Sequence, residues 1–200
     1  MKLFYAPASP FVRKVLIVAN ELGLAKRIET VTAAAHPINR DASILPANPL
    51  GQIPTLVLDD GSTLFDSRVI CEWLDAEAGG NRFFPAAGPA RWRALREQSI
   101  GDGIAAAAVL ARYEEAMRPP EKQHAPWREG QLEKIRTSLD AIEGEIGSMG
   151  SRFDIGGAAI VAALVYLDFR FADLGWRATR PNTAAWFKAA AERPSVKASA

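Results

Sequence analysis

The chain is poor in cysteine and in net charge, and each shortage excludes a class of protein. Cys71 is the only cysteine among 200 residues, which excludes an intramolecular disulfide and a multi-thiolate metal site. The 24 basic and 23 acidic residues leave a net charge of +1. We therefore expect neither a nucleic-acid binder nor a membrane-surface protein.

Long apolar runs are also missing. The most apolar stretch, residues 155–166, is too short to span a bilayer, and Asp168 and Arg170 follow it. Near the N-terminus, Pro7 and Pro10 interrupt any signal-peptide core. The sequence predicts a soluble, cytoplasmic protein without a metal, and its 48% hydrophobic content is enough for a sizeable core.

The first part of the chain alternates between short strands and helices. The predicted strands are rich in β-branched and aliphatic residues: 2–5, 28–31, 55–58 and 63–65. The last two form a hairpin around the turn at 59–62, and a short helix is expected near 40–45. This order predicts a parallel β-α-β unit followed by a hairpin in the same sheet.

Two helices of this part have recognisable starts. Ser9 is a suitable N-cap, with Pro10 at the first helical position, and Asp66-Ser67 can cap the second helix. The apolar face of the first helix holds Phe11, Val15, Val18, Ala19 and Leu22, with Arg13 and Lys14 off it. The second helix is expected to turn Val69, Ile70, Trp73 and Leu74 inward.

The second part of the chain is predicted to be wholly helical. Residues 79–88 are rich in Gly, Pro and Ala and form a linker. Helices are expected over 89–117, 127–147 and 155–171, with a last short helix around Trp186. The helix at 155–171 is apolar nearly all round, which predicts a central buried position.

The segment before the third strand holds a candidate cis peptide. Pro54 stands at the mouth of the strand, where its missing N–H does little harm. Only about 5% of X-Pro bonds are cis. If Ile53–Pro54 is cis, the backbone N–H and C=O of Ile53 could pair with an extended peptide.

Three motifs together resemble the cytosolic glutathione transferase family. They are LFYAPASPFVRKV at 3–15, NPLGQIPTL at 48–56 and FDSRVICEWL at 65–74. The resemblance covers essentially the whole chain. It implies a thioredoxin-like glutathione-binding domain (residues 1–78, β-α-β-α-β-β-α), a linker (79–88) and an all-helical domain (89–200).

The family also implies a function and an assembly. We expect a homodimeric glutathione transferase, with glutathione as co-substrate, a small hydrophobic electrophile as second substrate, and Pro54 cis. Two alternatives use the same scaffold: a non-catalytic binding or regulatory protein, and a glutathione-dependent peroxidase or isomerase.

The sequence departs from the family pattern at Asp154-Ile155-Gly156-Gly157, because Gly157 cannot complete the family's capping box. We expect that helix start to be less secure.

The resemblance places the thiol-activating group at Ser9. A free thiol has a pKa of about 8.5, and lowering it by about two units requires roughly 2.7 kcal/mol. A helix N-terminus and one hydroxyl hydrogen bond can supply that preference for the thiolate. The alternative role of Ser9 is capping alone, and Tyr5, near the end of the first strand, is the rival hydroxyl.

The remaining candidate ligands are spread along the first domain. Ser67 would hold the γ-glutamyl carboxylate, Asp66 would face its ammonium group, and Ile53 would pair with the cysteinyl unit. Gln52 and His36 are candidates for the glycyl end, although a solvated position is the commoner outcome for such residues.

In the helical half, Gly101-Asp102-Gly103 interrupts a long helix, and each glycine costs about 1 kcal/mol relative to alanine. This predicts a close backbone approach, to the other subunit or to the site. Asp102 could then reach a glutathione amine across the dimer interface, or lie on a solvated face. Five aromatic residues are candidates for the second-substrate pocket or for core packing: Trp92, Tyr113, Tyr166, Phe169 and Trp176.

Overall fold

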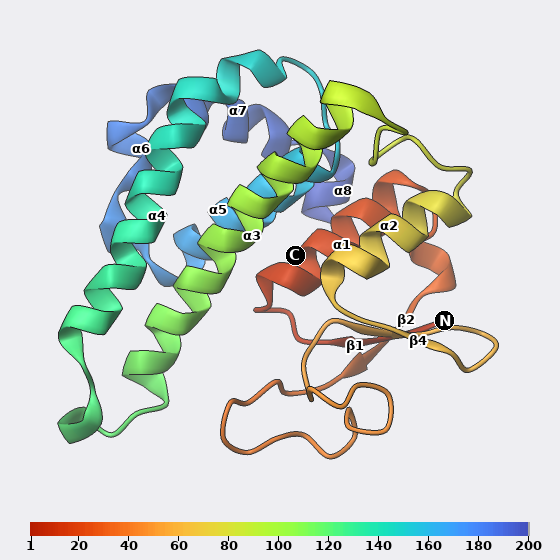
Figure 1. The fold of residues 1–200 in the computed structure, drawn as a ribbon, viewed down its shortest axis with the longest axis horizontal. Helices are drawn as coiled ribbons and strands as arrows, with labels where there is room; N and C mark the ends of the chain where they lie inside the picture. Colours follow the sequence, from red (N-terminus) through yellow and green to blue (C-terminus); the bar gives the residue numbers. More distant parts are fainter. Residues whose placement is uncertain (200) are drawn as a thin grey trace.

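The computed structural model describes residues 1–199, and its first part is a small sheet with two helices on one side (Figure 1). The elements in chain order are β1 (Lys2–Tyr5), α1 (Pro10–Glu21), a 3₁₀ turn (Ala25–Arg27), β2 (Glu29–Thr32), β3 (Thr55–Val57), β4 (Thr63–Leu64) and α2 (Ser67–Glu77). The strand order is β2-β1-β3-β4. β1 is parallel to β2, and β3 is antiparallel to β4, as the sequence predicts; β1 is also antiparallel to β3.

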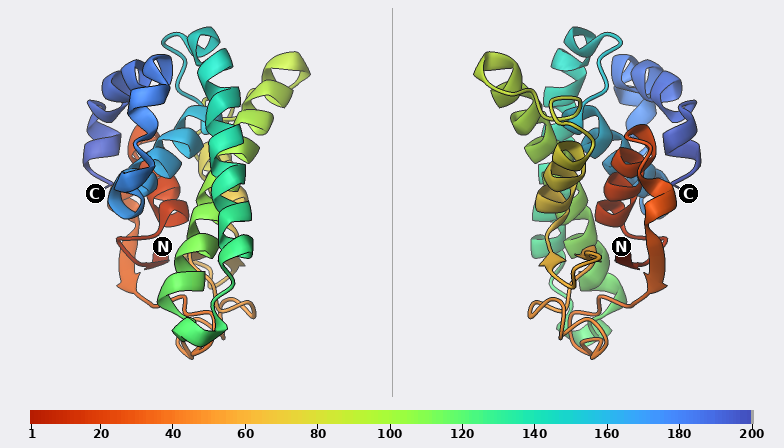
Figure 2. Two further views of the ribbon diagram at one scale, coloured as in Figure 1. Left: turned by 90° about the vertical axis from the view of Figure 1, so that its left-hand side faces the viewer. Right: turned by 90° about the vertical axis from the view of Figure 1, so that its right-hand side faces the viewer.

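The rest of the chain is helical, which confirms the predicted fold class. The helices are α3 (Gly88–Ala116), α4 (Ala125–Glu145), α5 (Ile155–Arg170), α6 (Trp176–Thr179), α7 (Pro181–Ala191) and α8 (Pro194–Lys197). Short 3₁₀ turns lie at Pro120–Lys122, Ile146–Met149 and Ala172–Leu174. Figure 2 shows α3 and α4 running side by side as the longest helices. Within residues 1–199, no single helix is long and apolar enough to cross a membrane; only α5 with Ala172–Thr179, across a 102° bend, meets that test of length and composition.

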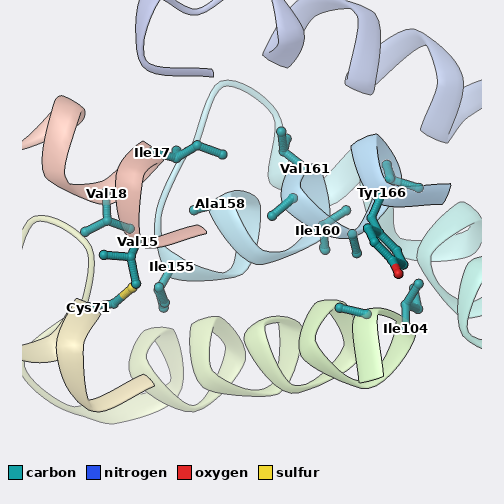
Figure 3. Packing of buried hydrophobic residues seen from close by; sticks show 14 of the residues in the cluster. Val15, Ile17, Val18, Cys71, Ile104, Ile155, Ala158, Ile160, Val161 and Tyr166 are labelled. Carbon is teal, nitrogen blue, oxygen red and sulfur yellow. The ribbon is translucent and has the colours of Figure 1, made fainter. Parts of the chain in front are cut away.

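The buried helix α5 organises the core, as its composition predicts. It packs against α3 on one side and α1 on the other. Figure 3 shows Val15, Cys71 and Ile155 gathered where α1, α2 and α5 meet, and all three are fully buried. One apolar cluster therefore runs through both parts of the chain.

The helices α3 and α5 approach closely at Gly101. A Cβ on Gly101 would lie 2.5 Å from the carbonyl carbon of Ala159 and 2.7 Å from the nitrogen of Ile160. The predicted close backbone approach is confirmed at Gly101, but its partner is α5 of the same chain and not another subunit or the site. A Cβ on Gly103 would meet nothing within 4 Å.

The segment between α2 and α3 is held by a buried carboxylate. Asp75 Oδ1 accepts hydrogen bonds from the backbone N–H groups of Arg82 (3.2 Å) and Phe83 (2.9 Å), and Oδ2 accepts from that of Phe84 (3.2 Å). The N–H of Ile155 donates to the carbonyl of Phe83 at 3.2 Å. These bonds fasten the linker to α2 and to the start of α5.

The expected short helix near residues 40–45 is absent. Within residues 33–54, all of which the structure describes, the chain forms turns without a helix. The carboxylate of Asp41 accepts from the backbone N–H of Ser43 at 2.9 Å and from that of Ala34 at 3.0 Å. Such side-chain bonds to the backbone compete with helix formation.

Two side chains differ from their predicted placement. Lys14, expected off the apolar face of α1, is only 1% exposed, because it has a charged partner on α3. Val69, expected inside, is 46% exposed. Position 69 lies one residue from the buried Ile70, so the two side chains leave α2 in different directions.

The start of α5 is better supported than its capping sequence suggests. Asp154 Oδ1 accepts from the N–H groups of Gly156 (3.0 Å) and Gly157 (3.4 Å). Arg152 pairs with Asp154 and also donates to both carboxylate oxygens of Glu97 at 2.8 Å. Glu97 of α3 thus holds Arg152, which in turn pairs with the capping carboxylate of Asp154.

Candidate functional site

Three chain segments converge at one edge of the sheet. Phe4 pairs with Thr55 across β1 and β3, and Leu56 pairs with Leu64 across β3 and β4. The end of β1, the end of β4 and the start of β3, which follows Pro54, therefore share this edge. Since α1 begins after β1 and α2 begins after β4, two helix N-termini face the same region as the Ile53–Pro54 peptide.

Ser9 is the N-cap of α1. Its Oγ accepts a hydrogen bond from the N–H of Val12 at 3.3 Å, and Pro10 is the first helical residue. The N–H of Ser9 donates to the carbonyl of Ala6 at 3.0 Å, which closes the turn after β1. Because Oγ acts as an acceptor in the cap, its proton stays available for donation to a ligand.

Tyr5, the rival hydroxyl, is the last residue of β1 and is half-buried. Its carbonyl accepts from the N–H of Ala33 at 2.9 Å, so its backbone is held in the sheet. Ser9 lies beyond the strand, at the start of α1. The two hydroxyl residues thus belong to different elements.

The Ile53–Pro54 peptide is cis, and so is Phe65–Asp66. The approach to Pro54 is fastened from the buried side by Asn48, whose Nδ2 donates to the carbonyl of Gln52 (3.1 Å) and to Thr55 Oγ1 (2.9 Å). The side chain of Gln52 itself is exposed.

Asp66 and Ser67 form the start of α2. Asp66 is the N-cap, and its Oδ1 accepts from the N–H of Arg68 at 2.8 Å. Ser67 is the first residue of the helix and is 2% exposed, whereas Asp66 is exposed. A negative charge near this helix end is favoured by the helix dipole and the free N–H groups.

Asp102 lies in a buried ion-pair cluster. Its Oδ1 is 2.6 Å from Lys14 Nζ, and its Oδ2 is 2.9 Å from Arg68 Nε. The predicted solvated position is wrong, because Asp102 is 6% exposed. Both of its oxygens are engaged within the chain, and one of them holds the residue that follows Ser67.

Sequence reasoning missed Lys14 and Arg68 as members of this cluster. A signal was present, because Lys14 lies three residues after Phe11 and four before Val18, inside the apolar stripe of α1. A lysine in such a stripe is buried when it finds a carboxylate. The partner is 88 residues away, so the sequence does not name it.

His36 lies in the loop between β2 and β3. Its Nδ1 accepts from the backbone N–H groups of Ile38 (3.1 Å) and Asn39 (2.9 Å), so the ring braces its own loop. Nearby, Tyr113 of α3 donates its hydroxyl to the carbonyl of Ala35 at 3.0 Å. This contact joins the loop to the helical part.

A mostly apolar pocket of about 450 Å³ lies between the β1–α1 turn and the end of α5. It is lined by Pro7, Ala8, Pro10, Arg13, Val165, Tyr166, Phe169 and Arg170. Ala8 and Pro10 flank Ser9 in the chain, so the pocket lies next to the N-cap of α1.

Two of the five aromatic candidates, Tyr166 and Phe169, line this pocket, and the other three are placed elsewhere. Trp92 is 68% exposed near the start of α3. Trp176 is buried edge-on against Phe187, with ring centroids 5.8 Å apart, and its Nε1 donates to Asp168 at 2.9 Å. Tyr113 holds the loop described above.

Cys71 has no role in this site. It is fully buried, and burial raises the pKa of its thiol to about 12. A thiol with so high a pKa is a poor nucleophile at neutral pH. Among residues 1–199, no group of three or more His, Cys, Asp or Glu side chains is arranged to hold a metal ion.

Comparison with known proteins shows the family. Residues 8–77 match the description "Glutathione S-transferase, N-terminal domain", and residues 125–189 match "Glutathione S-transferase, C-terminal domain". The chain belongs to the glutathione S-transferase family, which confirms the resemblance carried by the three sequence motifs.

Several relatives are similar over nearly their whole length. A glutathione transferase family member from Pseudomonas fluorescens Pf-5, solved with bound glutathione, is 45% identical, with a TM-score of 0.96 over 99% of this chain and 97% of that one. A structure from the same strain with bound S-(propanoic acid)-glutathione is 44% identical, with a TM-score of 0.91 over 100% of this chain and 98% of that one. The uncharacterized GST-like protein YibF of Escherichia coli K12 is 33% identical over 185 residues, which cover 91% of this chain and 89% of YibF.

Proposed function

We propose that this protein is a glutathione transferase, which stabilises the glutathione thiolate at Ser9 for attack on a small hydrophobic electrophile. One observation carries the proposal: Ser9 lies between the sheet edge where two helices begin and an apolar pocket. The similar structures with bound glutathione or its S-substituted form support glutathione as the co-substrate.

Thiolate stabilisation would come from Ser9 and the start of α1. The Ser9 hydroxyl donates to the sulfur while its oxygen keeps the cap bond from Val12. The helix dipole adds partial positive charge at the same place. These two contributions favour the thiolate by roughly the 2.7 kcal/mol that a two-unit fall in the thiol pKa requires.

The tripeptide would lie along the sheet edge. Neither the N–H nor the C=O of Ile53 bonds to another backbone group within residues 1–199, so both can pair with the cysteinyl unit. Ser67 and the α2 N-terminus hold the γ-glutamyl carboxylate, and Asp66 faces its ammonium group. Gln52 and His36 are assigned to the glycyl end.

Asp102 takes an indirect part in this proposal. Its carboxylate holds Arg68, the residue after Ser67, and thereby positions the start of α2. We also assign the protein to the cytoplasm, where glutathione is kept as a thiol, and to a homodimer. Sedimentation of the purified protein tests the dimer, and a single monomer boundary would contradict it.

The experiment for the function combines calorimetric titration of glutathione with an activity screen. We expect glutathione binding, conjugation of a model haloarene, and loss of conjugation in Ser9→Ala with binding retained. Binding without turnover of haloarenes, hydroperoxides or isothiocyanates would instead mark a non-catalytic binding protein. Turnover of hydroperoxides alone would mark a peroxidase.

A further inference from the structure

The pocket beside Ser9 carries positive charge on apolar walls. Arg13 reaches it from α1 and Arg170 from the last turn of α5, and no Asp or Glu is among its lining residues. A partly buried guanidinium such as that of Arg13 attracts an anion more strongly than one in open water, because the local dielectric constant is lower, whereas Arg170 is exposed.

Arg170 is held in place by stacking. Its guanidinium carbon lies 3.9 Å from the ring centroid of Phe169, which also lines the pocket. Stacking uses the flat face of the guanidinium and leaves the N–H edge free for a carboxylate. The nearest acid along α5, Asp168, is already engaged by Arg177 (2.6 Å) and by the indole of Trp176 (2.9 Å).

Arg13 is the more buried of the two. Its only side-chain hydrogen bond within residues 1–199 is a long one, 3.4 Å, from Nη1 to Ser199 Oγ. Burial lowers the pKa of its guanidinium, and the nearby Tyr5 partly offsets that change. A desolvated cation of this kind gains from an incoming anion.

We propose that the second substrate is an organic anion: an electrophile with an apolar, preferably aromatic body and a carboxylate that binds Arg170 and Arg13. This rests on the proposed transferase function and specifies its substrate class. The apolar body lies against Tyr166 and Phe169. For a haloarene, the thiolate sulfur forms the C–S bond, the C–Cl bond breaks, and chloride leaves with the bonding electron pair.

The kinetic test compares 4-chloro-3,5-dinitrobenzoate with its methyl ester. Each kcat/KM is divided by the rate constant with free glutathione, which removes the difference in intrinsic reactivity. We expect about a tenfold preference for the acid, the size of one charge-assisted hydrogen-bonded contact. In Arg170→Gln the preference falls to about twofold or less, because kcat/KM for the acid falls more than kcat/KM for the ester. Arg93→Gln, an exposed arginine outside the pocket, keeps the wild-type ratio.

A binding test separates this proposal from the function on which it rests. Calorimetry in the presence of glutathione compares 3,5-dinitrobenzoate with methyl 3,5-dinitrobenzoate, neither of which carries the chloride leaving group. We expect the acid to bind about tenfold tighter, and added salt to weaken the acid alone. If neither chlorodinitrobenzoate compound is conjugated to glutathione but the acid binds more tightly than the ester, the proposed transferase function is wrong and the proposed anion site is supported. Equal binding of acid and ester, or an unchanged ratio in Arg170→Gln, overturns the anion site.

Discussion

The ammonium nitrogen of Lys14 lies 2.6 Å from Oδ1 of Asp102, and this ion pair joins α1 to α3. Both side chains are buried, and the second oxygen of Asp102 receives Arg68 Nε at 2.9 Å. The carboxylate is therefore paired on both sides. Because Lys14 has little access to water, Asp102 is the anion that compensates its buried ammonium group.

Removal of the carboxylate should destabilise the fold. We expect Asp102→Asn to lower the free energy of unfolding by about 3–5 kcal/mol, because the charge of Lys14 then stays buried without an anion. Urea denaturation followed by circular dichroism measures the change.

Two controls identify the cause. Arg68→Gln removes a half-exposed partner and should cost less than about 1 kcal/mol. The double variant Lys14→Met/Asp102→Asn removes both charges and should recover much of the loss. If Asp102→Asn alone is as stable as the native protein, the buried pair is not a structural requirement.

The close approach of α3 and α5 gives a matched glycine pair. Gly101→Ala should cost about 1–3 kcal/mol, because the new Cβ meets backbone atoms of Ala159 that cannot rotate away. Gly103→Ala, in the same helix with open space around it, should stabilise by up to about 1 kcal/mol. Thermal unfolding of both variants should show a lower melting temperature for Gly101→Ala and an equal or higher one for Gly103→Ala. Equal changes in the two variants would contradict the close packing at Gly101.

Burial of Cys71 should make the protein less stable as the pH becomes alkaline. Burial raises the thiol pKa from 9.0 to about 12, so the unfolded chain ionises first. The contribution of the protonated Cys71 thiol to the free energy of unfolding is fully present below pH 9 and is lost as pH rises toward about 12. In this range the free energy of unfolding falls by at most about 1.4 kcal/mol per pH unit. The difference in unfolding free energy between native protein and Cys71→Ala isolates this contribution. A difference that stays constant through this pH range would show that folding does not raise the thiol pKa of Cys71.

One isosteric substitution distinguishes the capping role of Asp66 from its proposed role in binding the glutathione ammonium group. Asparagine caps helices as well as aspartate does, so Asp66→Asn should keep its stability within about 0.5 kcal/mol. The loss of its charge toward the glutathione ammonium should weaken glutathione binding about tenfold. Calorimetry measures the affinity, and Val69→Ala, an exposed change in the same turn, serves as control. Unaltered affinity in Asp66→Asn would leave Asp66 as a cap only.

The sequence predicts those features of the site that depend on neighbouring residues. Ser9 before Pro10 and Asp66 before Ser67 are local cap signals, and both hold in the structure. The β-α-β order with a terminal hairpin then implies that both helices start at one sheet edge.

Contacts between distant segments could not be predicted in the same way. The partner of Lys14 and the neighbour of Gly101 lie on other helices, and periodicity alone does not choose among them. The turns near Asp41 depend on side-chain bonds to the backbone that outcompete a short helix. The two arginines of the pocket meet only because α1 and α5 pack together.

If Ser9 lowers the thiol pKa of bound glutathione, the ultraviolet absorption band of the thiolate reports the change. The band is titrated against pH for glutathione bound to native protein, Ser9→Ala, Ser9→Thr and Tyr5→Phe. We expect a thiol pKa about two units below the free value of about 8.5 in native protein. The shift should persist in Ser9→Thr and Tyr5→Phe and disappear in Ser9→Ala. An unshifted pKa in native protein, or a shift that survives Ser9→Ala and vanishes in Tyr5→Phe, would contradict it.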